Sequence, residues 1–318
     1  MKISFLSNLF KKTRGESGRV VACFRGDLVL LVRVKQAKGK IKVVSFAVRG
    51  LSGRTASELA KLCDTLSFSG FRFSTLLGNS EYQLQMVEAP NVPPEELKAA
   101  VRWRVKDTLN YHVDDATIDV LKIPSGKQLS ERAQSMYVVA ASNDVIRKRI
   151  AMFEDAKLDL DIIDIPEMAQ RNVAALFEED GRGLALLAFD ESGGTLTFTG
   201  GGELYLARRI EISLGQLQDA DESLRRQSFE RLELEVQRSL DYFDRQFSHI
   251  SVKRLLVALP YQIGLVKVLQ ENLGVDVERL DLSQVMDLSA IPELASEEAQ
   301  MDAFYALGAA LRVERRAL

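Results

Sequence analysis

The sequence PPEELKAAVRWRVKDTL, from Pro93 to Leu109, opens the stretch that decides the fold. Two prolines and two glutamates are typical of a helix start, because proline lacks a donor that the first turn does not need and acids suit the positive end of the helix dipole. Apolar residues then recur at every fourth position, which predicts one buried stripe. The stripe comprises Leu97, Val101, Val105 and Leu109. Trp103, the one tryptophan, lies off this stripe.

The same stretch continues as strands and helices up to Val173. Apolar runs predict strands at 117–120 and 136–141. Ser142 directly precedes a predicted helix, and its hydroxyl can accept a hydrogen bond from a free N–H of the first turn. We therefore expect it to be the N-cap. Alternating apolar residues predict another strand at 158–162, and Pro166 marks a further helix start. We therefore expect a mixed α/β fold.

Outside this stretch, the two halves of the chain share an order of elements. The first half predicts strands at 19–24, 28–35 and 41–48, a helix at 55–66 and a strand at 71–77. The second half predicts strands at 184–189, 196–199 and 204–210, a long helix over 229–247 and a strand at 254–259, then a helix at 263–273, a strand at 275–280 and a helix at 299–312. Two copies of a β-β-β-α-β plan are what an actin-like duplicated architecture would show.

Several of these segments resemble a known family. They are Glu96-Leu97, Ala100-Val101-Arg102-Trp103, Asp119, the strand at 138–141, Asp164-Ile165-Pro166, and the runs at 234–243 and 305–312. They look like the actin-like pilus-assembly family PilM, and more closely its MshI relatives of mannose-sensitive pilus (MSHA) biogenesis. The resemblance covers most of the chain after residue 90. It implies an α/β, actin-like fold of duplicated ribonuclease H-like β-β-β-α-β units, with a small α+β subdomain inserted in the first half.

The expected domains follow from the plan and the resemblance together. Residues 1–16 form a basic, amphipathic N-terminal segment, 17–80 the first actin-like subdomain, 81–142 the inserted subdomain, 143–180 the completion of the first domain and 181–318 the second domain. The first segment is either a short helix at a membrane surface or a frayed terminus with a few apolar residues.

The composition bounds the classes of function. A chain of 318 residues with 46% apolar content can bury the cores of two domains. A net charge of −3 offers no broad field for nucleic acid, which we exclude as the main partner. Cys23 and Cys63 have neither disulfide-framework nor zinc-ligand spacing, which fits a reducing cytoplasm. No apolar run approaches the ~20 residues of a membrane span.

An actin-like ATPase needs glycine-rich hairpins, because only backbone without side chains brings N–H groups close to phosphates, and an acid to hold Mg²⁺. At the first expected hairpin, bulky Phe24 and Arg25 stand where the phosphate would lie, although Arg25 could meet an anion. At the third, where the family has a glycine pair, Leu259 is followed by Pro260 and Tyr261. Both positions look degenerate.

The second hairpin carries an acid, two glycines and a hydroxyl in an actin-like order. They are Asp190, Gly193, Gly194 and Thr195. This run either cradles phosphate or is a turn that uses aspartate and glycine for positive φ angles. Glu235 and Arg238 match the family's helix near the nucleotide ribose, or form a surface pair three residues apart. We expect no enzyme activity and no catalytic residue, with ATP and Mg as the alternative cofactors.

The sequence gives little support for other catalytic or metal-binding sites. His112 and His249 lie in no ligand-spaced cluster, and neither a nucleophile-elbow nor a Walker motif occurs. The acids at 114–115 and 159–164 could hold a metal, but alternating acids usually mark the wet face of a strand. No metal site is expected.

The resemblance also implies a partner. Proteins of the PilM family take a short cytoplasmic peptide of a PilN-like membrane-anchored protein in a groove beside the inserted subdomain. The matching residues here are Trp103, Arg104, Asp107, Leu109 and Tyr111. Arg104 replaces the family's usual acid, so the peptide preference should differ. The alternative is that Trp103 packs between the insertion and the first sheet.

Three functions follow. The first is a non-catalytic cytoplasmic scaffold of a type IV or mannose-sensitive pilus, on the cytoplasmic face of the inner membrane. Its partners would be a PilN-like bitopic inner-membrane protein and, beyond it, the pilus motor ATPase and platform proteins. The second is an actin-like ATP-binding protein or ATPase of the same machinery. The third is a GspL-like cytoplasmic component of type II secretion, which the absence of a membrane span at the C-terminal end disfavours.

Overall fold

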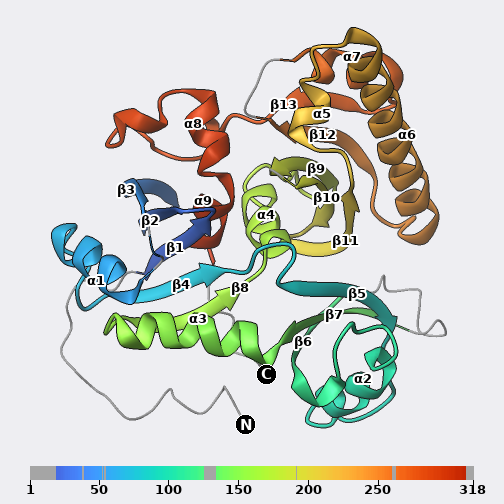
Figure 1. Ribbon diagram of the computed structural model, residues 1–318. Coiled ribbons are helices and arrows are strands. Elements are labelled where there is room, and N and C mark those ends of the chain that lie inside the picture. The colour runs from blue at the N-terminus through green and yellow to red at the C-terminus, as the bar shows by residue number, and fades with distance from the viewer. Residues whose placement is uncertain are drawn as a thin grey trace.

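The computed structural model describes residues 19–37, 39–51, 53, 55–124, 134–190, 192–259 and 263–312. The N-terminal segment predicted at 1–16 lies outside them. Within the described residues, the strands form two five-stranded sheets and one three-stranded sheet, with helices around and between the sheets (Figure 1).

The first sheet has the order β3-β2-β1-β4-β8. Its strands are β1 (Arg19–Arg25), β2 (Leu28–Ala37), β3 (Lys40–Gly50), β4 (Arg72–Leu76) and β8 (Asp159–Asp164). The first three pair antiparallel, whereas β4 runs parallel to β1 and β8 parallel to β4. Parallel neighbours need a crossover, and α1 (Ala56–Thr65) and α3 (Asn143–Asp155) supply the two helices. Both cover the outer face of the sheet, over a core that includes Phe73 and Phe153.

Local chemistry fixes where these helices begin. Thr55 and Glu58 form a reciprocal capping box at the start of α1. At α3, Val145 N donates to Ser142 Oγ at 3.3 Å, which confirms the predicted serine cap.

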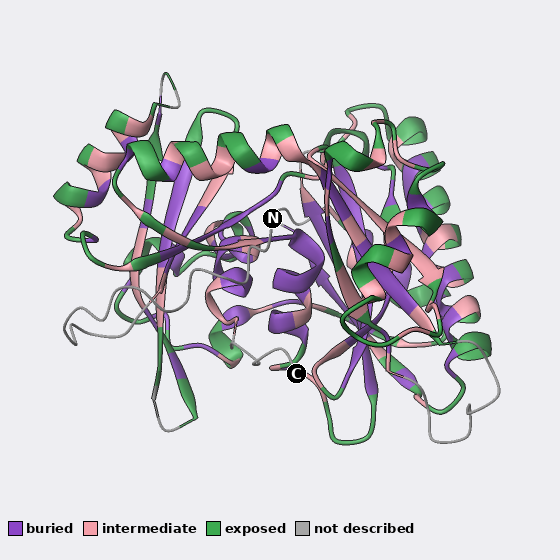
Figure 2. Cartoon of the chain, turned by 90° about the horizontal axis from the view of Figure 1, so that it is seen from below, coloured by how far each residue is buried: buried purple, intermediate pink, exposed green. Residues whose placement is uncertain are grey.

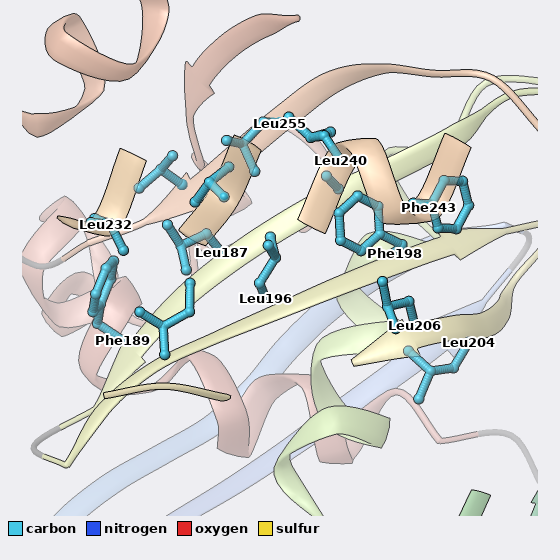
Figure 3. Packing of buried hydrophobic residues seen from close by; sticks show 14 of the residues in the cluster. Leu187, Phe189, Leu196, Phe198, Leu204, Leu206, Leu232, Leu240, Phe243 and Leu255 are labelled. Carbon is cyan, nitrogen blue, oxygen red and sulfur yellow. The ribbon is translucent and has the colours of Figure 1, made fainter. Parts of the chain in front are cut away.

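The second sheet repeats the plan in the order β11-β10-β9-β12-β13. Its strands are β9 (Gly183–Asp190), β10 (Gly193–Gly200), β11 (Glu203–Ile210), β12 (Val252–Ala258) and β13 (Asp276–Arg279). Its outer face is covered by α6 (Glu222–Gln246) and α7 (Leu265–Asn272), with the short α5 (Leu214–Leu217) before them. The apolar stripe of α6 packs on β9 and β10, where Phe243 stacks on Phe198 at 4.8 Å between ring centroids (Figure 3). The predicted long amphipathic helix is confirmed.

Two helices form a layer between the two sheets, and almost all of their residues are buried (Figure 2). The last helix of the first half, α4 (Pro166–Ala174), contacts β9, β10 and β11 of the second sheet. The last helix of the second half, α9 (Phe304–Ala310), contacts β1, β2 and β4 of the first sheet. They also pack on each other, where Asn172 Nδ2 donates to the carbonyl of Gly308 at 3.0 Å. Each half is therefore completed by a helix from the other.

The segment predicted as an insertion contains β5 (Tyr82–Glu88), α2 (Leu97–Val105), β6 (Ala116–Lys122) and β7 (Ser135–Ser142), with the short 3-10 helix η2 (Val113–Asp115) before β6. The strands form a sheet of order β5-β7-β6. Alternate residues of β7 face opposite cores: Val138 and Ala140 pack towards α2, whereas Tyr137 and Ala141 join the core of the second half. Burial on both faces explains the unbroken apolar run at 136–141.

Two helix predictions are wrong in extent. The helix expected to open at Pro93 begins at Leu97 and ends at Val105, so Leu109 lies beyond it in the following loop. The helix expected over 299–312 is two helices, α8 (Glu297–Asp302) and α9, which meet at Ala303. Short 3-10 turns at η3 (Leu282–Gln284) and η4 (Pro292–Leu294) lead up to them.

Candidate functional site

The hairpin between β9 and β10 is the part of the chain that most resembles a phosphate loop. Its centre is the carboxylate of Asp190. Oδ1 accepts from Ser192 N at 2.8 Å, Gly193 N at 3.1 Å and Ser192 Oγ at 2.7 Å. Arg209, across the sheet on β11, donates from Nη2 to Oδ1 at 2.9 Å and from Nη1 to Oδ2 at 3.2 Å. Burial opposes ionisation, but the hydrogen bonds from Arg209 and Ser192 outweigh it and hold the pKa of Asp190 below its ordinary value.

A side chain at either glycine of this hairpin would be crowded, by backbone at Gly193 and by neighbouring side chains at Gly194. Gly193 has φ +145°, and a Cβ on it would meet the carbonyl oxygen of Ile210 at 2.5 Å. A Cβ on Gly194 would touch the ring of Phe189 at 3.1 Å. Of the four predicted residues, Gly193 alone has a positive φ, and the aspartate serves through its side chain, as in an Asx turn. The hydroxyl of Thr195 accepts from Arg209 Nη1 at 3.0 Å.

A buried polar network joins this hairpin to the first half of the chain. The amide of Asn79, in the link between β4 and β5, donates to Asp190 Oδ2. Beside it, Tyr82 OH donates to Glu167 Oε2 at 2.5 Å, in the first turn of α4. Burial raises the pKa of Glu167, and burial together with that carboxylate raises the pKa of Tyr82. Sequence reasoning named neither Arg209 nor this pair.

Of the other two expected nucleotide positions, the first is occupied by paired and packed side chains, and the third lies partly outside the described residues. At the β1–β2 turn, Arg25 Nη1 pairs with Asp302 Oδ1 of α8 at 3.0 Å, and Phe24 packs edge-on to Phe153 with centroids 6.2 Å apart. After β12, Ala258 and Leu259 are both buried, and the residues from 260 to 262 lie outside the described part.

A hollow of about 470 Å³ lies between the end of β11 and α6. Its lining consists of Arg209, Ile210, Glu211, Ile212, Arg231, Leu234, Glu235 and Arg238. Arg238 Nη1 pairs with Glu235 Oε1 at 3.3 Å, with more than 45% of each side chain exposed, so the predicted surface pair is present. The structure thus brings Glu235 and Arg238 to the same hollow as Arg209, the residue that binds the Asp190 carboxylate in the β9–β10 hairpin.

The predicted partner residues divide into two groups on α2 and its loop. Trp103 is 69% exposed, and Arg104 and Asp107 are exposed beside it. Lys106 Nζ stands 5.4 Å from the centroid of the indole ring. The alternative that Trp103 packs between the insertion and the first sheet is therefore wrong.

Leu109 and Tyr111 instead pack against the small core beneath α2. The loop that carries them is fastened at several points. Thr108 Oγ1 donates to the amide oxygen of Gln85 at 2.7 Å, and Arg102 Nη2 donates to the carbonyl of Ala116 at 3.2 Å. The exposed part of the predicted site is the helix face around Trp103, and the buried part holds that face in place.

The acids considered as metal ligands have other partners. Asp161 pairs with Arg19 at 2.6 Å and Arg72 at 3.1 Å. Asp164 is buried and pairs with Arg312, which departs from the expected wet face. His112 and Asp114 are exposed neighbours at 3.5 Å. Across the described ranges, His, Cys, Asp and Glu side chains form no group of three or more that fits a metal ion.

Two further observations bear on cofactor and membrane. The fold plan implies ATP with Mg²⁺, but the hairpin N–H groups that would hold phosphate already donate to Asp190. At this hairpin the residues present therefore do not fit that group. As for the membrane, none of the helices in the described part of the chain has the combined length and apolar character that a span requires.

No family model matches this sequence, and no curated protein matches it either. Among solved structures, a chain of the PilM–PilN type IV pilus biogenesis complex superposes with a TM-score of 0.71 at 18% identity, over 94% of this chain and 98% of that one. The cytoplasmic domain of EpsL, an inner membrane component of the type II secretion system of Vibrio cholerae, gives 0.47 at 11% identity over 90% and 94%. A Bacteroides thetaiotaomicron protein with an actin-like ATPase fold gives 0.49 at 8% over 85% and 93%.

At such identities the likeness shows the fold. The chain has an actin-like α/β fold, with two sheets of the same strand order and a small inserted α+β unit in its first half. The predicted fold class is confirmed.

Proposed function

We propose that this protein is a non-catalytic cytoplasmic scaffold of a type IV or mannose-sensitive pilus assembly machinery, which docks the cytoplasmic peptide of a PilN-like membrane-anchored protein. The observation that carries the proposal is Trp103, a large aromatic side chain left 69% exposed on a well-packed helix. Exposed aromatics of this kind dominate binding energy at protein interfaces. The likeness to a chain of the PilM–PilN complex supports the choice of partner.

The helix presents this side chain rigidly. Val101 and Val105 are buried against the three-stranded sheet, and Lys98 Nζ pairs with Asp119 Oδ1 of β6 at 2.7 Å. A pre-ordered surface loses little conformational entropy on binding. Arg104 and Lys106 beside the indole favour a peptide with an acidic residue close to its apolar anchor.

Absence of catalysis is the second half of the proposal. It is supported by the closed hairpin at Asp190 and by the ion pair of Arg25 at the first turn. Without a phosphate cradle, an actin-like fold has no means of positioning ATP for hydrolysis. The protein would then act at the cytoplasmic face of the inner membrane through contacts alone.

The test is calorimetric titration with a synthetic peptide from the cytoplasmic N-terminus of a PilN-like protein of the same organism. Trp103→Ala should lower affinity about thirtyfold, the effect of losing a ~2 kcal/mol anchor. Stability should change by less than about 0.5 kcal/mol, because the side chain is exposed. Leu234→Ala is the matched control, an exposed apolar residue on α6, and should bind as the wild type does. Equal affinity of the Trp103 variant and the wild type would refute the docking site.

A further inference from the structure

The hydrogen bonds around Asp190 have the arrangement of a bound oxyanion. One carboxylate oxygen accepts from two successive backbone N–H groups, of Ser192 and Gly193, and from the Ser192 hydroxyl. An arginine, Arg209, binds both oxygens of the same carboxylate. Backbone N–H groups at a tight turn together with a guanidinium are the donors that phosphate groups also use.

We propose that this hairpin is an oxyanion site that the Asp190 carboxylate permanently fills, so that removing the carboxylate opens it to a phosphate-type anion. The proposal goes beyond the scaffold function, because it concerns the hairpin and not the surface of α2. It names the ligand class of the opened site and the residue that excludes that ligand.

Two features of the structure support self-occupancy over an ordinary turn. Arg209 is held by contacts on both sides of the hairpin: besides Asp190, it donates to Thr195 Oγ1 at 3.0 Å and to the Ser192 hydroxyl. Two-residue turns close without such a clamp, since their register comes from the strands themselves. The carboxylate also receives the amide of Asn79 from the other half of the chain. All these donors converge on one carboxylate, as they would on a ligand.

Gly193 and Arg209 do not depend on the carboxylate for their backbone positions. Asp190 pairs with Gly193 in the β9–β10 ladder, and Thr195 pairs with Arg209 in the β10–β11 ladder. A Cβ at Gly193 is excluded by the carbonyl of Ile210, so the backbone there is fixed by β11. The opened site should therefore keep the Gly193 N–H group and the guanidinium in place. Arg209 also lines the hollow of about 470 Å³ between the end of β11 and α6.

The experiment is calorimetric titration of the full chain with inorganic pyrophosphate and, separately, ADP, both without metal. We expect no measurable binding to the wild type. Asp190→Ala should bind pyrophosphate at least about tenfold more tightly than the wild type, because two backbone donors and Arg209 are released. Asn79→Ala, which keeps the carboxylate in the hairpin, should gain nothing, and Asp190→Ala with Arg209→Ala should lose the gain.

A second variant guards against misfolding. Asp190→Asn keeps an oxygen for the turn N–H groups and removes the charge that faces Arg209, so it should show a smaller gain. The proposal is overturned if folded Asp190→Ala and Asp190→Asn bind pyrophosphate no better than the wild type, or if the wild type itself binds ADP or pyrophosphate as tightly as they do. Peptide binding at Trp103 should be unchanged in every variant, so failure here is separable from failure of the docking proposal.

Discussion

Replacement of Gly308 by alanine should separate the two central helices and weaken the whole fold. Gly308 lies on α9 where that helix crosses α4. A Cβ there would meet the carbonyl oxygen of Ala169 at 2.3 Å, its carbon at 2.8 Å and Val173 Cγ2 at 3.1 Å. Two of these atoms belong to backbone, so no side-chain rotation relieves the clash, and the helices must separate by at least about 0.7 Å.

The size of the effect follows from two opposing contributions. Alanine gains about 1 kcal/mol over glycine in a helix interior. Overpacking of a close-packed interior typically costs about 1–3 kcal/mol, and more when backbone must move. Separation would also stretch the bond from Asn172 Nδ2 to the Gly308 carbonyl, now 3.0 Å, and loosen a layer that both sheets share. We expect a net loss of about 3 kcal/mol in the free energy of unfolding.

Urea denaturation followed by circular dichroism is a suitable assay, with Gly215→Ala as the matched control. Gly215 also lies in a helix, but a Cβ on it would meet only Ser213 Oγ at 3.8 Å. That variant should be as stable as the wild type or up to about 1 kcal/mol more stable. If Gly308→Ala unfolds at the same urea concentration as Gly215→Ala, the close approach of α4 and α9 does not hold the halves together.

Two further predictions use the buried titratable groups. Burial raises the pKa of Glu167, so above that pKa the folded state carries a costly charge that is absent below the ordinary pKa of glutamate. Glu167→Gln should thus be more stable than the wild type at pH 8, with the gain shrinking as pH falls, whereas a gain constant from pH 4 to 8 in urea titrations would count against it. Burial raises the pKa of Cys23 to about 11 and of Cys63 to about 12. At pH 8 a disulfide reagent should label both the partly buried Cys23 and the buried Cys63 slowly in the native protein and rapidly in urea, and rapid native labelling of Cys63 would contradict its burial.

The layout of both halves was predictable because local signals agree with burial there. The strand runs of the first half match β1 to β4 within two residues at most ends. Ser142 caps α3 as expected, and Pro166 occupies the first turn of α4. These features depend on side chains within a few residues of each other, so one sequence contains what is needed to find them.

The predicted ends of helices and strands were wrong where tertiary contacts override the local sequence pattern. Leu109 continues the four-residue period of α2, yet the chain leaves the helix after Val105, where Thr108 of the loop is fastened to Gln85 of β5. Strand β5 was not predicted, although apolar and polar residues alternate regularly from Tyr82 to Met86, and its residues before Glu88 are all half-buried. It is held by pairing to β7, which comes about fifty residues later.

The candidate site shows the same limit of sequence-based prediction more clearly. Asp190, Gly193 and Thr195 could be found because they are adjacent in sequence. Arg209 is 19 residues away from Asp190 and reaches it only through the pairing of β10 with β11. A regular register counted from the pair of Gly200 with Glu203 would have set Arg208 beside Thr195, but the irregularity between Phe198 and Thr199 places Arg209 there instead. The partner of the carboxylate therefore needed the structure.

The difference between residues adjacent in sequence and a partner found only in the structure affects how an aspartate and glycine hairpin should be interpreted in an actin-like fold. A tight turn and a phosphate cradle impose the same demands on sequence: glycine where backbone approaches closely, and an acceptor or anion for the turn N–H groups. At Gly193 the approaching atom is a carbonyl of β11, and the anion is the side chain of Asp190. The aspartate and glycine motif alone thus indicates the backbone geometry of the hairpin. Whether a ligand enters depends on a residue elsewhere, here Arg209, which binds the carboxylate and holds it where an external phosphate would have to sit.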